Sequence, residues 1–194
     1  KEIISKIKTY VEEYSHVNWI RGNGWSLPIF KDGNPSRHIL DKISTEKPMY
    51  FLSADGHSAW VNSKALSIAG LNENTRDPLN GRIERDPESR IPSGVLREDA
   101  MALVESLIPN YTKKQIDNGL FISVKEANKF GITSILDAGT ESINQKGSKE
   151  SYFDGLDAYR EATKNQEISL RVNASQYASP STWRKDIENI KNRR

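Results

Sequence analysis

The sequence predicts an α/β fold in which short apolar strands alternate with amphipathic helices. Apolar runs of strand length recur near residues 18–23, 49–54, 132–137 and 168–175. Segments with helical spacing of apolar residues lie between these runs, and glycine or Asp-Gly follows three of the four. Such alternation is typical of a parallel sheet with helices packed outside it. Four strands match half of an eight-stranded barrel, which needs ~250 residues.

The composition excludes several classes of protein. Of the 194 residues, 36% are hydrophobic and 28% are charged, which is enough apolar material to bury a core. The net charge of +2 gives no strong field for nucleic acid. No run approaches the ~20 apolar residues of a membrane span. The chain has no cysteine, so disulfides and thiol catalysis are excluded. We therefore expect neither a nucleic-acid nor a membrane partner.

Helical spacing and capping residues predict the elements up to residue 70. The first helix covers residues 2–14, and its apolar face is formed by Ile3, Ile4, Ile7 and Val11. Ser36 or Pro35 begins a second, short helix. The strand over 49–54 is apolar without alternation, as expected for a strand covered on both faces. Asn62 or Ser63 caps the next helix, and Gly70 ends it.

Residues 71–95 change character, because they are polar and rich in turn-forming residues. We interpret this segment as an excursion from the main fold, with a turn at Asn80-Gly81 and at most one short exposed strand. Helical structure is expected to resume at residue 95. The excursion is not interpreted as a domain boundary, so residues 1–194 are expected to belong to a single domain.

The remaining elements again alternate between helix and strand. Thr112 and Gln115 form a capping box for a long helix, and Gly131 terminates it. A strand ending at Asp137 follows, and then a helix and the strand over 168–175. A last helix completes the chain.

Chemistry in such folds gathers at the carboxyl ends of the strands. The polar and aromatic residues expected there are Arg21, Asn23, Trp25, Asp55, His57, Trp60, Asn62, Asp137, Thr140, Asn173, Gln176 and Tyr177. Glu98 is a further candidate, because the chain returns from the excursion at this point. The tryptophans have a second interpretation, because such residues in a sheet protein often form the core.

His57 is the most informative of these residues. Imidazole can ligate a metal, act as an acid or base near neutral pH, or hydrogen-bond a substrate carbonyl. The neighbouring Gly56 allows the backbone to approach a ligand closely. The alternative is a histidine whose hydrogen bonds are met locally by the helix that follows. Asp55, Glu98 and Asp137 have similar alternatives as a turn residue, a helix-start carboxylate and a loop cap.

Several catalytic motifs are absent. The sequence contains no H-x-H, no H-E-x-x-H, no G-x-S-x-G and no glycine-rich phosphate loop. With three scattered histidines and no cysteine, a self-contained zinc site is not expected. A site built from carboxylates stays open.

Several segments together resemble a known family. They are WIRGNGW, RHILDKIS, KPMYFLSADGHSAWVNSKALSIAGL, TRDP, GRIERD, IPSGVLREDA and GITSILDAG. Nearly the whole chain is similar to amidohydrolase family 3, the YtcJ-like branch of the metal-dependent hydrolases. The segments DGHSAWVNSKAL and SGVLRE carry this resemblance most specifically. Members of the family are longer, and they combine a small β-sandwich with a (β/α)8 barrel that binds divalent metal.

The resemblance implies a partial TIM-barrel segment of an enzyme that hydrolyses C–N bonds of small-molecule, non-peptide amides. It implies a divalent ion, with zinc expected, in the full-length protein. Three residues are placed in the catalytic site: His57, Glu98 and Asp137. The substrate-binding residues that it implies are Trp25, Asp55, Trp60 and Asn62. The polar excursion matches a segment that covers the barrel mouth.

The family's H-x-H pair and its later histidines have no counterpart in this sequence. We therefore expect an internal fragment that binds no metal by itself and is inactive. The alternative is a non-catalytic regulatory or ligand-binding module derived from the same fold, because some relatives have names that suggest regulators of secreted-enzyme production. The unpaired strand edges of an incomplete barrel also predict a possible homodimer. A cytoplasmic location is expected.

Overall fold

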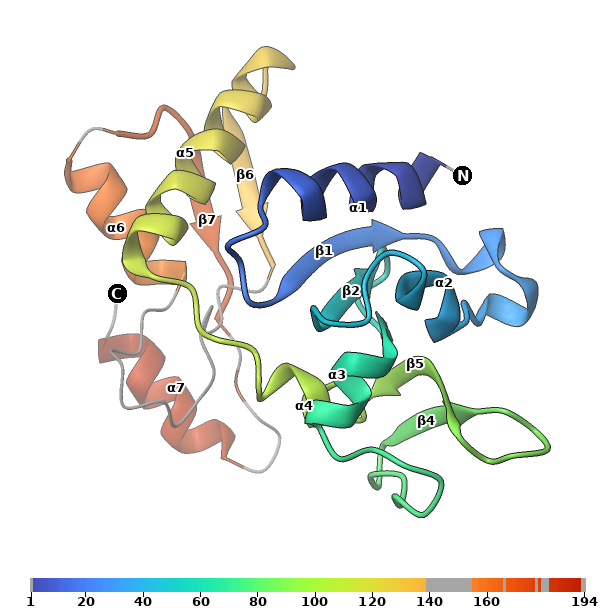
Figure 1. The fold of residues 1–194 in the computed structure, drawn as a ribbon. Helices are drawn as coiled ribbons and strands as arrows, with labels where there is room; N and C mark the ends of the chain where they lie inside the picture. Colours follow the sequence, from blue (N-terminus) through green and yellow to red (C-terminus); the bar gives the residue numbers. More distant parts are fainter. Residues whose placement is uncertain (1, 139–154, 166, 177, 179–181, 193–194) are drawn as a thin grey trace. The chain divides into compact units, whose positions relative to one another are not determined.

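The computed structural model describes residues 2–138, 155–165, 167–176, 178 and 182–192 (Figure 1). The chain divides into two compact units, residues 1–109 and 110–194. Each unit has its own sheet and its own helices. Among the described residues, no helix combines the length and the apolar character that crossing a bilayer requires.

The first unit is built on a five-stranded mixed sheet. Its strand order is β1-β2-β3-β5-β4, and only β1 and β2 are parallel. The strands are β1 (Ile20–Trp25), β2 (Met49–Ser53), β3 (Ser58–Val61), β4 (Gly81–Arg85) and β5 (Pro92–Glu98). The predicted strands near 18–23 and 49–54 are therefore confirmed, and so is their parallel pairing. The rest of the sheet is antiparallel, which the alternating α/β pattern did not predict.

The expectation of at most one short exposed strand within residues 71–95 is corrected by the structure. The segment contains β4 and the start of β5, which pair with each other and continue the main sheet beyond β3. Ile83 in β4 is only 2% exposed. The helix expected from residue 95 is also wrong, because residues 95–98 belong to β5. The polar composition of the segment misled the prediction, since its charged side chains pair with one another inside the fold.

Helices and 3-10 turns cover one face of this sheet. They are α1 (Glu2–Glu13), η1 (Leu27–Ile29), η2 (Lys31–Gly33) and α2 (Arg37–Asp41). The predicted helix over 2–14 is confirmed, and its Ile7 is buried against the sheet. The buried centre of this face is aromatic, because Trp60 contacts Trp25 and Phe51 at ring-centroid distances of 6.3 Å. Burying an aromatic side chain of this kind stabilises the fold by roughly 1.5–3 kcal/mol.

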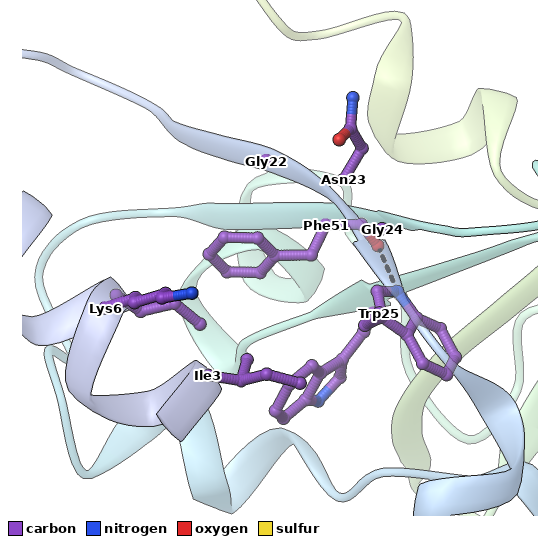
Figure 2. Close-up of a pocket in the computed structure, with 9 residues that line it drawn as sticks. Ile3, Lys6, Gly22, Asn23, Gly24, Trp25 and Phe51 are labelled. Atoms are coloured by element: carbon purple, nitrogen blue, oxygen red, sulfur yellow. Dashed lines mark hydrogen bonds between the residues drawn. The ribbon is translucent and has the colours of Figure 1, made fainter. Parts of the chain in front are cut away.

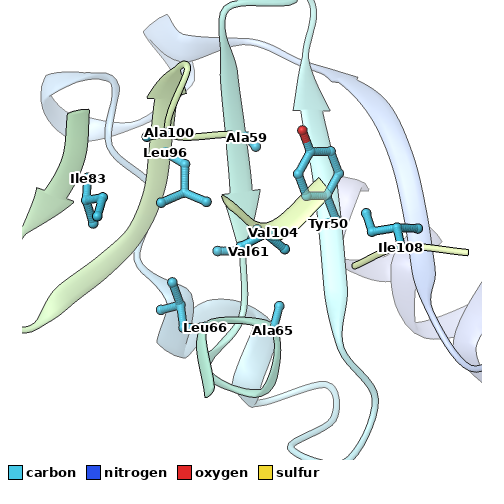
Figure 3. Packing of buried hydrophobic residues seen from close by; sticks show 10 residues of the cluster. All are labelled: Tyr50, Ala59, Val61, Ala65, Leu66, Ile83, Leu96, Ala100, Val104 and Ile108. Carbon is cyan, nitrogen blue, oxygen red and sulfur yellow. The ribbon is translucent and has the colours of Figure 1, made fainter. Parts of the chain in front are cut away.

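The opposite face of the sheet packs on α3 (Ser63–Ile68) and α4 (Ala102–Glu105), as Figure 3 shows. Alternation along β2 and β3 separates the two faces, because Tyr50 and Val61 enter this cluster while Phe51 and Trp60 enter the aromatic one. The cluster is Tyr50, Ala59, Val61, Ala65, Leu66, Ile83, Leu96, Ala100, Val104 and Ile108. The sheet is therefore covered on both faces, as the apolar run over 49–54 predicted.

One glycine is required where the first layer meets the sheet. Gly94 in β5 has φ +115°, a region that side chains rarely adopt. A Cβ at this position would lie 2.6 Å from the Cβ of Arg37 and 2.8 Å from the carbonyl oxygen of Val61. Glycine therefore allows α2 to pack directly on the backbone of the sheet.

The predicted helix boundaries that rest on local capping are confirmed. Asn62 is the N-cap of α3, and its side chain accepts a hydrogen bond from the backbone of Ala65. Thr112 and Gln115 form both hydrogen bonds of a capping box. Gly131 follows that helix with φ +72°.

Among the residues of the second unit that the structure describes, a two-stranded parallel sheet and three helices are present. The elements are α5 (Lys113–Lys129), β6 (Ser134–Asp137), α6 (Gly155–Lys164), β7 (Arg171–Ala174) and α7 (Trp183–Asn192). The third and fourth predicted strands are confirmed as β6 and β7, which pair in parallel. An ion pair of 2.8 Å between Lys113 and Glu161 connects α5 to α6.

A polar network stabilises the edge of the five-stranded sheet at which β4 lies. Arg97 donates hydrogen bonds to Glu84 (2.7 Å), Ser58 (2.9 Å) and Asn34 (2.7 Å). Burial opposes ionisation of Glu84, but the hydrogen bonds from Arg82 and Arg97 outweigh it and lower the pKa of this carboxyl. Glu84 is thus a buried anion that requires a cationic partner.

We predict that Arg97→Met destabilises the fold by about 3 kcal/mol, because the buried Glu84 carboxylate loses the less exposed of its two arginine partners. Arg82→Met is the matched control, since Arg82 contacts the same carboxylate but its side chain is 64% exposed. We expect this control to cost less than ~1 kcal/mol. Urea unfolding of the three proteins measures both values. Equal losses in the two variants would contradict the role given to Arg97.

Candidate functional site

The turn between β2 and β3 is held by a small set of local hydrogen bonds. The Asp55 carboxylate accepts from the Ser53 hydroxyl (2.5 Å) and from the backbone N–H of His57 (3.1 Å). These two bonds lower the pKa of Asp55. Gly56 adopts φ +78°, which the tight turn requires. The turn therefore fixes the backbone of His57 and leaves its side chain 67% exposed.

The pairing of β3 with β5 brings His57 next to Glu98. Ser58 lies opposite Arg97 in the ladder, and the next residues outward are His57 and Glu98. The Glu98 backbone N–H donates to the carbonyl oxygen of His57 (3.2 Å). Nδ1 of His57 lies 3.1 Å and 3.2 Å from the two carboxylate oxygens of Glu98. Two residues predicted separately from the sequence therefore form one pair.

The backbone of Glu98 is unusual. Its φ is +49°, in the left-handed region that non-glycine residues rarely occupy. Residues held in this conformation cluster at functional sites. The conformation ends β5 and turns the chain, because the N–H groups of Ala100 and Met101 then bond back to Arg97 and Glu98.

The pair defines the state of the imidazole. A carboxylate only accepts hydrogen bonds, so Nδ1 of His57 carries the proton and Nε2 remains available as an acceptor. The hydrogen bond and the charge of Glu98 raise the pKa of His57. The site can therefore hold or transfer a proton at Nε2, or donate a hydrogen bond from Nε2 when the ring is protonated.

Asp137 lies at the end of β6 in the second unit. The Tyr159 hydroxyl of α6 donates a 3.0 Å hydrogen bond to its carboxylate. Burial and this bond raise the pKa of Tyr159 to about 12. The structure thus gives Asp137 a neutral hydrogen-bond partner at the carboxyl end of a parallel strand. Its catalytic role stays a prediction.

The predicted substrate-binding residues Trp25, Trp60 and Asn62 belong to the buried framework of the first unit. Nε1 of Trp25 donates to the carbonyl oxygen of Phe51 (2.8 Å), and Nε1 of Trp60 donates to that of Ser36 (3.2 Å). Trp60 has no exposed surface, and Trp25 is 3% exposed. The second interpretation of the tryptophans, as core residues, therefore describes their positions. Substrate binding by either residue stays a prediction.

Asn62 is fully buried and makes four hydrogen bonds to backbone groups. Its Oδ1 accepts from Met49 and Ala65 at 3.0 Å, and its Nδ2 donates to the carbonyl oxygens of Ser44 (3.2 Å) and Lys47 (2.9 Å). The side chain thus connects β2, the preceding loop and the start of α3. Its hydrogen-bonding capacity is used within the fold.

Sequence reasoning missed Ser53, the last residue of β2. It is 3% exposed; its hydroxyl donates to Asp55 and accepts from the backbone N–H of Ser58 (3.0 Å). The signal was present as a hydroxyl two residues before an Asp-Gly turn. Thr140 and Tyr177, which were also predicted near the site, lie outside the described residues.

The described residues do not form a metal site by themselves. His57 and Glu98 are two potential ligands, and within the described part of the chain no three His, Asp or Glu side chains gather closely enough to hold an ion. A catalytic zinc site requires about three protein ligands. The pair therefore fits a contributing position and not a complete metal centre.

A sequence profile of the amidohydrolase family matches residues 1–192. The chain therefore belongs to the amidohydrolase family, and the resemblance found in the sequence is confirmed. A solved structure of an uncharacterized metal-dependent hydrolase from Pyrococcus horikoshii shares the fold, with a TM-score of 0.52 at 19% identity. The alignment covers 97% of this chain and 32% of that one.

Three curated relatives show how much of a family member this chain represents. It is 31% identical over 171 residues to protein LONG AFTER FAR-RED 3 of Arabidopsis thaliana. It is 30% identical over 142 residues to an N-substituted formamide deformylase of Arthrobacter pascens, and 26% identical over 166 residues to the exoenzymes regulatory protein AepA of Pectobacterium carotovorum. The matches cover 88%, 71% and 78% of this chain, but only 29%, 26% and 36% of those proteins.

We predict that Asn62→Ala lowers the free energy of unfolding by about 3 kcal/mol, because it removes a helix cap and leaves buried backbone groups without partners. Asn72→Ala is the control, since Asn72 lies in an exposed turn. We expect its effect to stay below ~1 kcal/mol. Urea unfolding gives both values. Unchanged stability in Asn62→Ala would show that Asn62 is not part of the frame.

We predict that Glu98→Gln lowers the pKa of His57, because the variant loses the charge that stabilises the imidazolium. The wild-type pair favours the folded state below the ordinary histidine pKa, and this contribution disappears as the pH rises through the raised value. A titration of the His57 ring protons by NMR measures the shift. Glu46→Gln, at an exposed site, serves as the control. An unchanged His57 pKa in Glu98→Gln would contradict the pairing.

Proposed function

We propose that this chain is part of a metal-dependent amidohydrolase that hydrolyses non-peptide C–N bonds of small-molecule amides. The family match over residues 1–192 carries this proposal. One relative, the Arthrobacter enzyme, is named for deformylation of N-substituted formamides, which cleaves such a bond. The exposed pair of His57 and Glu98 supports it further, because the pair offers proton-transfer chemistry on a fixed turn.

Each predicted site residue has a distinct role in this proposal. His57 contacts the substrate, and its Nε2 hydrogen-bonds the amide or transfers a proton to it. Glu98 holds the tautomer and the orientation of the ring. Asp55 fixes the turn on which His57 stands. A catalytic role of Asp137 is a separate part of the proposal, which the family resemblance supports. Trp25, Trp60 and Asn62 support this arrangement from within the sheet.

We propose that the divalent ion, zinc, is bound by the longer protein. When bound, such an ion activates water and polarises a carbonyl group. The 194-residue chain has no H-x-H, and its described residues bring together only two potential ligands at the His57 turn. The chain spans between 26% and 36% of the three relatives described above. We therefore propose that it is inactive alone.

The architecture of the longer protein belongs to the same proposal. The parallel pairs β1–β2 and β6–β7 are assigned as strands of a (β/α)8 barrel. The antiparallel strands β3, β5 and β4 are assigned to an extension of that barrel near its mouth. Parallel strands joined through helices, as found here in two places, are the units from which such barrels are built.

The test is amide hydrolysis by the longer gene product and by this chain, measured as amine release from N-substituted formamides. We expect activity only in the longer protein. His57→Ala should lower its kcat/KM by about 10²–10⁴-fold, as loss of an acid–base group does. His38→Ala is the control, since the side chain of His38 is exposed and bonds to Asp41 of its own helix. Hydrolysis by the isolated chain, or full activity of His57→Ala, would overturn the corresponding part of the proposal.

A regulatory or ligand-binding module is the second candidate, and the name of one relative favours it. The Pectobacterium relative is called an exoenzymes regulatory protein. The same experiment separates the two candidates. A longer gene product that carries no divalent metal after growth with zinc, and that releases no amine, supports the regulatory module.

A further inference from the structure

A half-open pocket lies in the first unit between α1 and the strands β1 and β2 (Figure 2). Its volume is about 270 Å³. Ligand pockets usually measure ~300–1,000 Å³. A dry apolar cavity of ~150 Å³ already binds benzene. The pocket therefore has room for a small molecule with a single ring.

The walls are apolar. Ile3 of α1 faces Trp25 and Phe51 of the sheet across the pocket (Figure 2), and Ile7 of the same helix also lines it. The indole N–H of Trp25 is bonded to the carbonyl oxygen of Phe51, and that of Trp60 to the carbonyl oxygen of Ser36. Both indole N–H groups are therefore engaged within the fold, and neither gives a ligand a free hydrogen-bond donor.

Glycine at position 22 keeps this wall in place. A Cβ at Gly22 would lie 2.9 Å from Cδ1 of Phe51, closer than side chains tolerate. Any larger residue would push the Phe51 ring away from its position beside β1. The backbone of β1 is consequently exposed along the pocket at Gly22 and Gly24.

Lys6 supplies the charge at the rim. Its ammonium group pairs with Glu2 at 2.8 Å, and both side chains are largely exposed. An exposed pair of this kind is weak and screened by solvent. An ammonium group has three N–H donors, so it can retain Glu2 and still bind an anion. Lys6 therefore selects for an acidic group on a ligand whose remainder is apolar.

We propose that this pocket binds a small carboxylic acid carrying one aromatic ring or one branched aliphatic group. The apolar group lies against Trp25 and Phe51, and the carboxylate contacts Lys6. This pocket is distinct from the His57–Glu98 pair, because neither of those residues lines it, although Trp25 and Trp60 belong to both the pocket wall and the framework behind that pair.

Phenylacetate tests the proposal, with phenylacetamide as its neutral counterpart and acetate as the acid without a ring. The readout is the indole N–H signal of Trp25 in ¹⁵N NMR spectra of the 194-residue chain. We expect saturable shifts with phenylacetate, weaker binding of phenylacetamide and none of acetate. Trp183, in the second unit, is the internal reference and should not shift.

Variants of α1 separate the two parts of the site. Lys6→Met should weaken phenylacetate binding about threefold, the effect of losing one exposed ion pair, and leave phenylacetamide binding unchanged. Lys8→Met is the matched control on an exposed position of the same helix. Glu2→Gln should strengthen phenylacetate binding, because it removes a competing carboxylate.

Ile3→Trp should abolish binding of both ring compounds, since the larger side chain occupies the pocket from its rim. The unchanged signals of the remaining residues verify that this variant folds. Absence of a saturable Trp25 shift with phenylacetate would overturn the site. Equal affinities for the acid and the amide, or an unchanged affinity in Lys6→Met, would overturn the assigned ligand class.

Discussion

The antiparallel pairing of β3 with β5 is the constraint on which the rest of the first unit depends. Its register places Ser58 opposite Arg97. On one side of the ladder, Arg97 reaches Glu84 and the loop at Asn34. At its end, residues 41 positions apart in the sequence become the pair of His57 and Glu98. A shift of one residue would reverse the faces and separate both sets.

The segment DGHSAWVNS shows how one short motif serves both the frame and the site. Strand alternation points Trp60 into the aromatic cluster and Val61 into the cluster on the opposite face. Asn62 then uses all its hydrogen-bonding capacity on backbone groups. The turn at its start is the exposed part of the segment, and His57 lies there. The rigidity of the frame is what keeps an exposed imidazole in a defined position.

Membership of the amidohydrolase family gives these local features a common setting. The described residues include two parallel strand pairs with their helices, and the predicted catalytic residues are His57 and Glu98 in the first unit and Asp137 in the second. The match covers 88% of this chain but 29% of the plant relative, so a whole family member contains far more than the parts described here. We propose on this basis that residues of the present chain orient the substrate, whereas residues elsewhere in the longer protein bind the metal.

The sequence by itself determined the features that depend on neighbouring residues. The capping box of Thr112 and Gln115, the cap at Asn62 and the turn at Asp55 were predictable, because each is closed by atoms within a few residues. The four predicted strands were also found, because short runs rich in apolar and β-branched residues bounded by turn formers favour strands locally.

The tertiary structure alone decided how the polar segment at 71–95 is used. The charged residues of this segment did not indicate a buried strand. The fold accommodates Glu84 of β4 because Arg97 of β5 forms an ion pair with it across the ladder. For the same reason, the sequence did not indicate that Glu98 is the hydrogen-bond partner of His57. Strand register is a long-range property, and composition or periodicity within one segment does not encode which residue will lie opposite.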